Sequence, residues 1–258
     1  MRKQLANLGF FFGLPVVLVA IWWLATLDGG SFYVPTPGRL GEAFAGVWLG
    51  ERFFTDLLPS LGRLVVGLVL TVVLGILLGF LIGSFQWLRQ TLEPLMDFFR
   101  AIPPPVLIPV LSLVIGVNDQ MRIFAIVFGA IWPVLLNTVE GVRSADEVLS
   151  ETCQAFHLSR WQRIVYFIGP SSSPQIMTGV RQSLSIGLIL LVISEMFGAS
   201  QGIGFTVILF QRSFKIPEMW SGILMLGLVG IALATVTKIV EGRVLRWYYG
   251  LKDVQHAG

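Results

Sequence analysis

The sequence predicts an all-α membrane protein whose chain crosses a bilayer six times. Of its 258 residues, 55% are hydrophobic and only 13% are charged, whereas about a quarter of the residues in a soluble domain are charged. The apolar residues are gathered in runs of about 20, which is the length a helix needs to span the hydrocarbon layer. The 19 Phe and 8 Trp residues suit a chain anchored by aromatic rings at the membrane interface. This composition excludes a soluble enzyme, a disordered chain and a nucleic-acid-binding protein.

Six apolar segments are predicted as spans. The first follows the basic residues Arg2 and Lys3, and its apolar stretch exceeds the roughly 7–15 residues of a signal-peptide core, so we expect a retained anchor. The second is nearly uninterrupted, whereas the third is interrupted by Arg100 and by three prolines at 103–105. The predicted spans are residues 8–27, 65–85, 92–117, 121–139, 175–198 and 220–240.

The placement of basic residues predicts the orientation. If the N-terminus is inside, the segments on that side hold more Lys and Arg than the segments on the opposite side. Basic residues are retained on the cytoplasmic side of a membrane. We therefore expect both termini in the cytoplasm.

The segment 140–174 is too polar to cross and is predicted to lie on the cytoplasmic side. Ser144-Ala145-Asp146-Glu147 has the spacing of a capping box, so a helix is expected to start at Ala145. A second capping box at 159–162 predicts another short amphipathic helix, ended by Gly169-Pro170. The two helices would meet at His157-Leu158, either as a hairpin lying on the membrane surface or as a docking element for a partner protein.

The sequence lacks the residues that several classes of protein need for their function. The single cysteine, Cys153, excludes an internal disulfide and a cysteine metal site. Neither His157 nor His256 lies in a predicted span, which argues against a membrane-embedded enzyme. The sequence contains no G-x-x-x-x-G-K-[ST] motif, so the chain is not expected to hydrolyse ATP itself. A channel or secondary transporter would explain the spans but not the capped cytoplasmic hairpin, and no internal repeat supports it.

The polar segment carries a family resemblance. Residues 151–157, followed by Ile168-Gly169-Pro170, resemble the EAA loop of bacterial ABC importer permeases, whose pattern is Glu-Ala-Ala, three residues, Gly, and later Ile-x-Leu-Pro. Here Thr152-Cys153 replaces Ala-Ala and His157 replaces the glycine. Histidine is among the non-glycine residues that adopt a left-handed backbone more readily, so the turn is expected to persist. Further stretches resemble the nitrate/sulfonate/taurine/bicarbonate branch: residues 58–63, 99–103, 158–162, 194–199 and 202–204.

The resemblance covers about residues 34–246 and implies a MetI-like permease fold in the bacterial inner membrane. It implies a permease subunit that forms the translocation pathway together with a second copy of the chain. Two cytoplasmic ATPases would supply ATP and Mg, and an extracytoplasmic binding protein would deliver the substrate; no cofactor is expected in this chain. The implied substrate is a small anion such as a sulfonate, taurine, nitrate or bicarbonate, with an uncharged heterocycle or pyrimidine precursor as the alternative.

By the same resemblance, the hairpin couples the permease to the ATPase. Glu151 would be the charged contact, and the turn from Ala155 to Arg160 would sit in a groove of the ATPase. Trp161 with Ile164 would hold the hairpin against the permease. The coupling residues expected are Glu151, Ala155, Phe156, His157, Leu158, Ser159, Arg160 and Trp161.

Polar or irregular groups within the spans are candidates for the translocation pathway, because such groups are costly in lipid. Pro103 and Pro104 cannot continue regular helical hydrogen bonding, and irregular backbone is tolerated next to a water-filled cavity. The third span, with Arg100, is therefore placed at the pathway. Residues 198–204 are expected to form a re-entrant turn or a turn on the outer surface.

Three further polar residues lie within predicted spans. Glu195 is interpreted as a gate, as the partner of a basic residue in the outer loops, or as an interfacial carboxylate that reaches water. Arg181 either extends to the headgroups or faces the pathway, where it would suit an anion. Asn137 is a pathway candidate that could equally form a hydrogen bond between helices.

Overall fold

In this computed structural model the chain is described at residues 2–27, 29 and 31–255, and its side chains at 13–27, 29, 31–146 and 148–250. All regular structure within these residues is helical, which confirms the predicted all-α fold. In chain order the elements are α1 (Arg2–Ala25), α2 (Pro37–Trp48), the π-turn η1 (Phe53–Leu57), α3 (Leu58–Ser84), α4 (Gln86–Ala101), α5 (Pro104–Val114), α6 (Asp119–Arg143), α7 (Glu147–Ala155), α8 (Arg160–Arg163), the π-turn η2 (Ile164–Ile168), α9 (Gly169–Met196), α10 (Ile203–Arg212), α11 (Ile216–Val244) and α12 (Arg246–Gln255).

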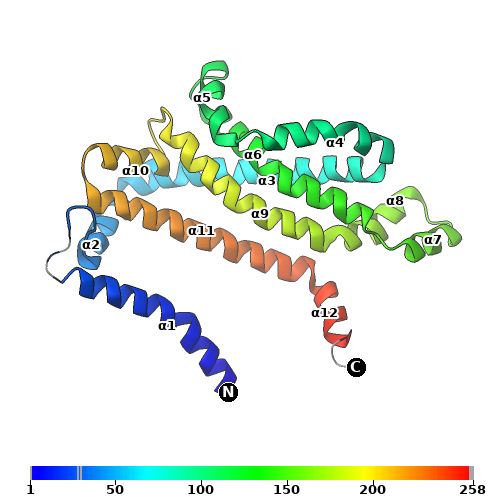
Figure 1. Ribbon diagram of the computed structural model, residues 1–258, viewed down its shortest axis with the longest axis horizontal. Coiled ribbons are helices and arrows are strands. Elements are labelled where there is room, and N and C mark those ends of the chain that lie inside the picture. The colour runs from blue at the N-terminus through cyan, green and yellow to red at the C-terminus, as the bar shows by residue number, and fades with distance from the viewer. Residues whose placement is uncertain (1, 28, 30, 256–258) are drawn as a thin grey trace.

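The long helices α3, α6, α9 and α11 run alongside one another and form the body of the protein (Figure 1). Helix α6 is central, because its most extensive contacts are with α3 on one side and α9 on the other. A hydrophobic core joins α2, α3, α6, α9 and α10 at one end of the bundle, where Trp48, Leu64 and Ile126 are fully buried. We call this the outer end, following the predicted orientation.

By length and composition, four helical segments could cross a membrane, or five if the bent pair α4–α5 counts as one span. The described residues thus support a protein that crosses the membrane several times. The four segments overlap the second, fourth, fifth and sixth predicted spans: Phe53–Ser84, Asp119–Arg143, Arg160–Met196 and Ile216–Val244.

The first predicted span, 8–27, lies in α1, which stands away from the bundle (Figure 1). Its described apolar part, Gly13–Ala25, is shorter than the length required of a span. The side chains of residues 8–12 and all of residue 28 lie outside the described part of the chain. The sixth crossing therefore stays a prediction.

The third predicted span, 92–117, consists of two helices that meet at 87°. The break lies at Ile102 and Pro103, whose backbones are extended with ψ of 119° and 114°. Each of these residues precedes a proline, and a following proline disfavours the helical conformation. Pro104 begins α5, because a proline is tolerated in the first turn of a helix.

Helix α9 is longer than the sequence predicted, because Gly169-Pro170 does not end the preceding helix. The chain continues from α8 through η2 into α9 as one segment of 37 residues. Pro170 lacks an N–H, and its ring would crowd the carbonyl of Tyr166, four residues earlier. Tyr166 lies within the π-turn, which widens the helix at this point. The same arrangement recurs where η1 precedes Pro59 at the start of α3.

Close approach of α3 to α6 depends on glycines spaced four residues apart. A Cβ at Gly79 would lie 2.5 Å from Cβ of Thr138 and 2.9 Å from the carbonyl oxygen of Leu135. A Cβ at Gly75 would lie 2.8 Å from Cβ of Val134. Small residues at this spacing allow membrane helices to pack backbone against backbone. The two helices are therefore held at a fixed distance by sterics.

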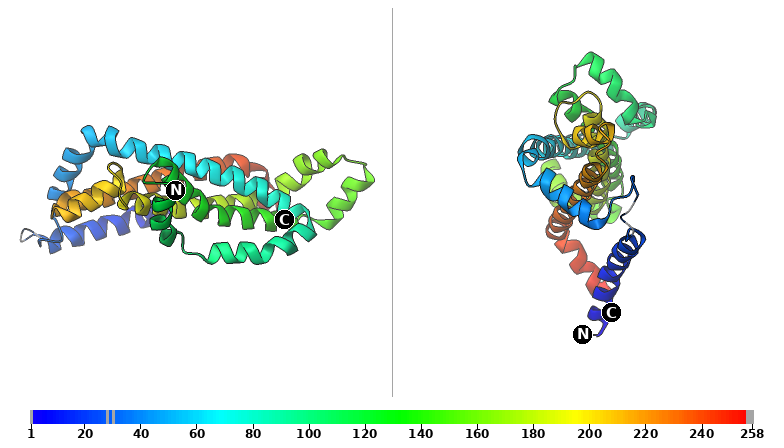
Figure 2. Two further views of the ribbon diagram at one scale, coloured as in Figure 1. Left: turned by 90° about the horizontal axis from the view of Figure 1, so that it is seen from above. Right: turned by 90° about the vertical axis from the view of Figure 1, so that its left-hand side faces the viewer.

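The two ends of the bundle differ in character. Helices α2 and α10 cover the outer end, while α7 and α8 form a hairpin that extends beyond the opposite end (Figure 2). The predicted outer turn at 198–204 leads into α10. These two ends hold most of the sequence-predicted site residues.

Candidate functional site

An ionic cluster, buried except at Asp119, ties four helices together at the outer end. Nη1 of Arg63 on α3 lies 2.9 Å from Oε1 of Glu195 on α9, and the two side chains are 3% and 0% exposed. Nε of Arg63 also lies 2.8 Å from Oδ1 of Asp119, which pairs with Arg122 on α6. The outer cluster, as we call it, consists of Asp56, Ser60, Arg63, Asp119, Arg122 and Glu195.

The outer cluster caps the N-terminus of α10. The backbone N–H groups of Gly202, Ile203 and Gly204 donate to Asp56 at 2.8 Å, Ser60 at 3.0 Å and Glu195 at 3.0 Å, respectively. These are orphan donors of a helix start, which usually find a capping side chain within their own segment. Gly202 has a φ of +124° and contacts the Glu195 carboxylate so closely that a Cβ would collide with it.

This geometry makes the outer cluster a rigid junction. Buried charges are costly unless they are paired and hydrogen-bonded, and each carboxylate in the cluster has at least one arginine or backbone N–H partner. The interpretation of Glu195 as an interfacial carboxylate that reaches water is wrong, because its side chain is fully buried. Its partner is Arg63 on α3, a basic residue near the outer end.

At the opposite end, the hairpin begins two residues later than expected. Asp146, not Ser144, is the N-cap of α7, and its carboxylate accepts from the N–H of Leu149 at 2.9 Å. Ser144 instead ends α6. The predicted start at Ala145 is therefore wrong by two residues.

The turn of the hairpin is a Schellman motif built around His157. The N–H of Leu158 donates to the carbonyl of Cys153 at 3.0 Å, and the N–H of His157 donates to that of Gln154 at 2.9 Å. This pair of bonds closes a helix whose next residue is left-handed. His157 has a φ of +52°, so it adopts the conformation that a glycine takes without steric cost.

Two polar contacts fix the second arm of the hairpin. Ser159 and Gln162 form the predicted reciprocal capping box at the start of α8. Arg163 reaches back to α7, where its Nη2 donates to Oγ of Ser150 at 2.9 Å. Arg163 was not singled out from the sequence, because an arginine in a short amphipathic helix resembles any solvated charge.

The predicted coupling residues lie together on the exposed hairpin. Phe156 is 77% exposed and Trp161 is 72% exposed. Many of their polar neighbours are also exposed. Trp161 does not pack against the bundle, as an anchoring role would require. The exposed predicted residues are Glu151, Ala155, Phe156, His157, Ser159, Arg160 and Trp161, whereas Leu158 is half-buried.

The pathway candidates are dispersed over the molecule. Arg100 forms an exposed ion pair with Asp97 in its own helix, next to the break at Pro103 and Pro104. Among the described residues, Asn137 bonds within its own helix, where its Nδ2 donates to the carbonyl of Pro133 at 2.8 Å. An asparagine side chain within a helix can donate to the carbonyl four residues earlier.

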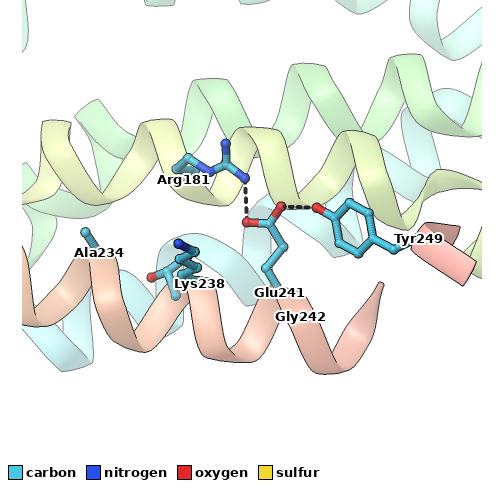
Figure 3. A pocket seen from close by; sticks show the side chains of 7 residues that line it. Arg181, Ala234, Lys238, Glu241, Gly242 and Tyr249 are labelled. Atoms are coloured by element: carbon cyan, nitrogen blue, oxygen red, sulfur yellow. Dashed lines mark hydrogen bonds and ion pairs between the residues drawn. The ribbon is translucent and has the colours of Figure 1, made fainter. Parts of the chain in front are cut away.

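Arg181 lies at the edge of a pocket between α9, α11 and α12 (Figure 3). Its Nη2 pairs with Oε2 of Glu241 on α11, and Tyr249 on α12 donates to Oε1 of Glu241 at 2.9 Å. The hydrogen bond to Glu241 raises the pKa of the Tyr249 phenol above its ordinary value. Glu241, Lys238 and Tyr249 were not predicted as site residues, although a charged pair near the end of a span is a signal for them.

Comparison with known proteins agrees with this fold and these motifs. Residues 71–247 match the family described as binding-protein-dependent transport system inner membrane component. SsuC of Escherichia coli K12, named as an aliphatic sulfonates transport permease protein, is 30% identical over 256 residues, covering 98% of this chain and 97% of that protein. SsuC of Bacillus subtilis 168 is 29% identical over 236 residues, covering 91% and 86%.

A solved structure shares the fold at lower identity. An inward-facing structure of the MetNI methionine ABC transporter superposes with a TM-score of 0.62 and 17% identity, covering 73% of this chain and 94% of that chain. The MetI-like fold expected from the sequence is thereby confirmed. Because the family match spans more than half of the residues, the chain belongs to the binding-protein-dependent transport system inner membrane components, the permease subunits of ABC transporters.

Proposed function

We propose that this chain imports a small sulfonate as one half of a permease dimer, driven by two cytoplasmic ATPase subunits that hold ATP and Mg. An extracytoplasmic binding protein would deliver the substrate to the outer end. Both termini would lie in the cytoplasm, and the pathway would run between the two permease copies. The observation that carries the proposal is the exposed hairpin α7–α8.

The hairpin has the surface of a docking element. Val148, Phe156 and Trp161 are 69%, 77% and 72% exposed, although they lie on a segment that extends past the bundle (Figure 2). Large apolar side chains grouped on one exposed element mark a site of protein or membrane contact. The polar residues among them, Glu151 and Arg160, favour a protein groove with matching polar groups.

Motion at the hairpin would reach the membrane directly. Helix α8 continues through η2 into α9 without a break, so a displacement of the hairpin acts as a lever on a span. Arg163 and Ser150 hold the two arms of the hairpin together, which would let α7 and α8 move as one unit. ATP binding would thus bias two arrangements of the spans through a rigid connection.

The outer cluster would hold its helices as one body that moves with the hairpin, and the helix break would let a second part change its angle to that body. Helices α3, α6, α9 and α10 meet in the outer cluster, whereas α4 and α5 are joined to each other by an extended connection at Ile102–Pro103. Hinges are commonly such short segments at the ends of elements. We therefore place a hinge at Ile102–Pro103, between α4 and α5.

The sulfonate assignment rests on the two SsuC proteins, which match nearly the whole chain. An uncharged heterocycle is the alternative substrate. Uptake into vesicles with labelled alkanesulfonate, tested for competition by taurine and by an uncharged pyrimidine, separates the two. Competition by the pyrimidine alone would overturn the sulfonate assignment and leave the permease function intact.

The docking role is tested by co-purification. The double variant Glu151→Ala/Ala155→Arg is expected to reach the membrane at the wild-type level, to lose the co-purifying ATPase and to lose ATP-dependent uptake. The matched control, Glu42→Ala/Ala45→Arg, makes the same changes on exposed positions of α2 at the outer end and should retain the ATPase. Recovery of the ATPase with the hairpin variant at wild-type yield would contradict the proposal.

A further inference from the structure

A cavity of about 500 Å³ lies where α9, α11 and α12 converge at the inner end of the bundle. Figure 3 shows Arg181 reaching from α9, and Glu241 and Tyr249 reaching from α11 and α12, with Lys238 beside them. The hairpin α7–α8 contributes no residue to its wall. The permease function assigned above makes no use of this cavity.

The cavity has an excess of one positive charge. Glu241 is fully engaged, because Arg181 pairs with one of its oxygens and Tyr249 donates to the other. Arg181 is 63% exposed, and its ion pair with Glu241 uses a single nitrogen. Lys238 forms no direct ion pair among the described side chains and interacts with Glu241 only through space. One ammonium and part of one guanidinium therefore remain available to an anion.

The position of the cavity along α11 places it at the level of the lipid headgroups. Lys238 follows Ile216, the first residue of α11, by 22 residues, which is about 33 Å at 1.5 Å per residue. The hydrocarbon layer is about 30 Å thick. Trp247 and Tyr248 follow at the start of α12, and such aromatic residues gather at the membrane interface.

The cavity also extends toward the membrane centre. Its wall includes Ala234, one turn of α11 before Lys238, where the small side chain leaves room beside an apolar surface. Gly242 leaves similar room next to Glu241. A site with basic groups at the headgroup level and an apolar extension below them matches the chemistry of an anionic phospholipid.

We propose that this cavity is a binding site for a phosphate-type oxyanion, held by Lys238 and Arg181, and that an anionic phospholipid headgroup supplies it. Lys238 contributes the unpaired charge. Arg181 contributes directional donors while its pair with Glu241 keeps the guanidinium in place. The bound headgroup would join α9 to α11, the span that follows α10, at the end of the bundle that lacks the outer cluster.

The thermal unfolding of the full-length chain in detergent tests the site. Phosphatidylglycerol is compared with phosphatidylcholine. In a separate comparison, inorganic phosphate is compared with chloride at equal ionic strength. At about 100 times the dissociation constant we expect phosphatidylglycerol to raise the Tm by about 5 °C, and Lys238→Gln to abolish most of this shift. Arg243→Gln removes a cation from the exposed last turn of the same helix, outside the cavity, and should leave the shift unchanged.

Each outcome decides between the possibilities. A shift with phosphatidylglycerol that depends on Lys238 supports the lipid as ligand, and an equal Lys238-dependent shift with inorganic phosphate supports the site but assigns it to a soluble oxyanion. Equal shifts with phosphatidylcholine would overturn the proposal, as would shifts that Arg243→Gln reduces as much as Lys238→Gln. Arg181→Gln provides a second variant, expected to weaken the shift while lowering the Tm without lipid.

Discussion

Arg63 and Glu195, separated by 132 residues in sequence, form an ion pair of 2.9 Å in the interior of the outer end. Ser60 donates to the same Glu195 oxygen at 2.6 Å, and the N–H of Gly204 donates to the other oxygen at 3.0 Å. Glu195 therefore connects α3 to the start of α10 from its position on α9. A single carboxylate sets the relative position of three helices.

Removal of that carboxylate is expected to destabilise the protein strongly. Glu195→Ala leaves the buried guanidinium of Arg63 with Asp119 alone and leaves the Gly204 N–H without its acceptor. Breaking a buried ion pair by removing one partner costs about 3–5 kcal/mol, and Glu195→Gln should cost less because it can still accept from Gly204. Thermal unfolding in detergent measures both.

The control for this experiment is an exposed ion pair. Asp97 and Arg100 are 57% and 51% exposed, so Asp97→Ala should cost less than about 1 kcal/mol. If Glu195→Ala unfolds at the same temperature as Asp97→Ala, the outer cluster contributes little to stability and its role as a rigid junction fails.

The glycines of α3 allow a matched comparison within one helix. Gly79→Ala places a methyl group 2.5 Å from Cβ of Thr138, and overpacking of this kind costs about 1–3 kcal/mol. A Cβ at Gly62 would have no atom within 4 Å, so Gly62→Ala should stabilise the helix by up to about 1 kcal/mol. Opposite shifts in the unfolding temperature are expected, and equal shifts would show that α3 and α6 are not in close contact.

The turn of the hairpin is expected to respond to the backbone preference at position 157. A left-handed conformation costs a non-glycine residue about 1–2 kcal/mol, so His157→Gly should protect the amides of the turn further from hydrogen exchange. His157→Val, with a β-branched side chain, should weaken their protection, while His157→Asn should be nearly neutral. Greater protection with valine than with glycine would refute the Schellman geometry.

The sequence was sufficient to predict the elements that depend on local patterns. Runs of apolar residues located the long helices, and the spacing of Ser159 and Gln162 located a capping box that the structure contains. The resemblance at residues 151–157 located the exposed hairpin. These features depend on neighbouring residues, so one sequence can reveal them.

Features that depend on distant residues were harder to predict. Nothing near Glu195 indicates that its partners are Ser60 and Arg63, because these residues meet only when α3 and α9 pack. Gly169-Pro170 was expected to end a helix, and the prediction failed because the π-turn before it accommodates the proline. The partners of Arg181 could be identified only once α9 and α11 lay side by side.

Because Tyr249 contacts Glu241, we expect its phenol to ionise at a higher pH than an ordinary tyrosine. The phenol donates to Glu241 at 2.9 Å, and this hydrogen bond raises the pKa of Tyr249 above the ordinary value of about 10. A pKa raised in the folded state means that the stabilising contribution is complete below about pH 10 and is lost as the pH rises through the raised value. In a titration followed by tyrosinate absorbance, the difference between wild type and Tyr249→Phe should isolate this phenol. Its pKa should return toward the ordinary value in Glu241→Gln, whereas a difference curve already centred on that value in the wild type would show that the hydrogen bond does not form.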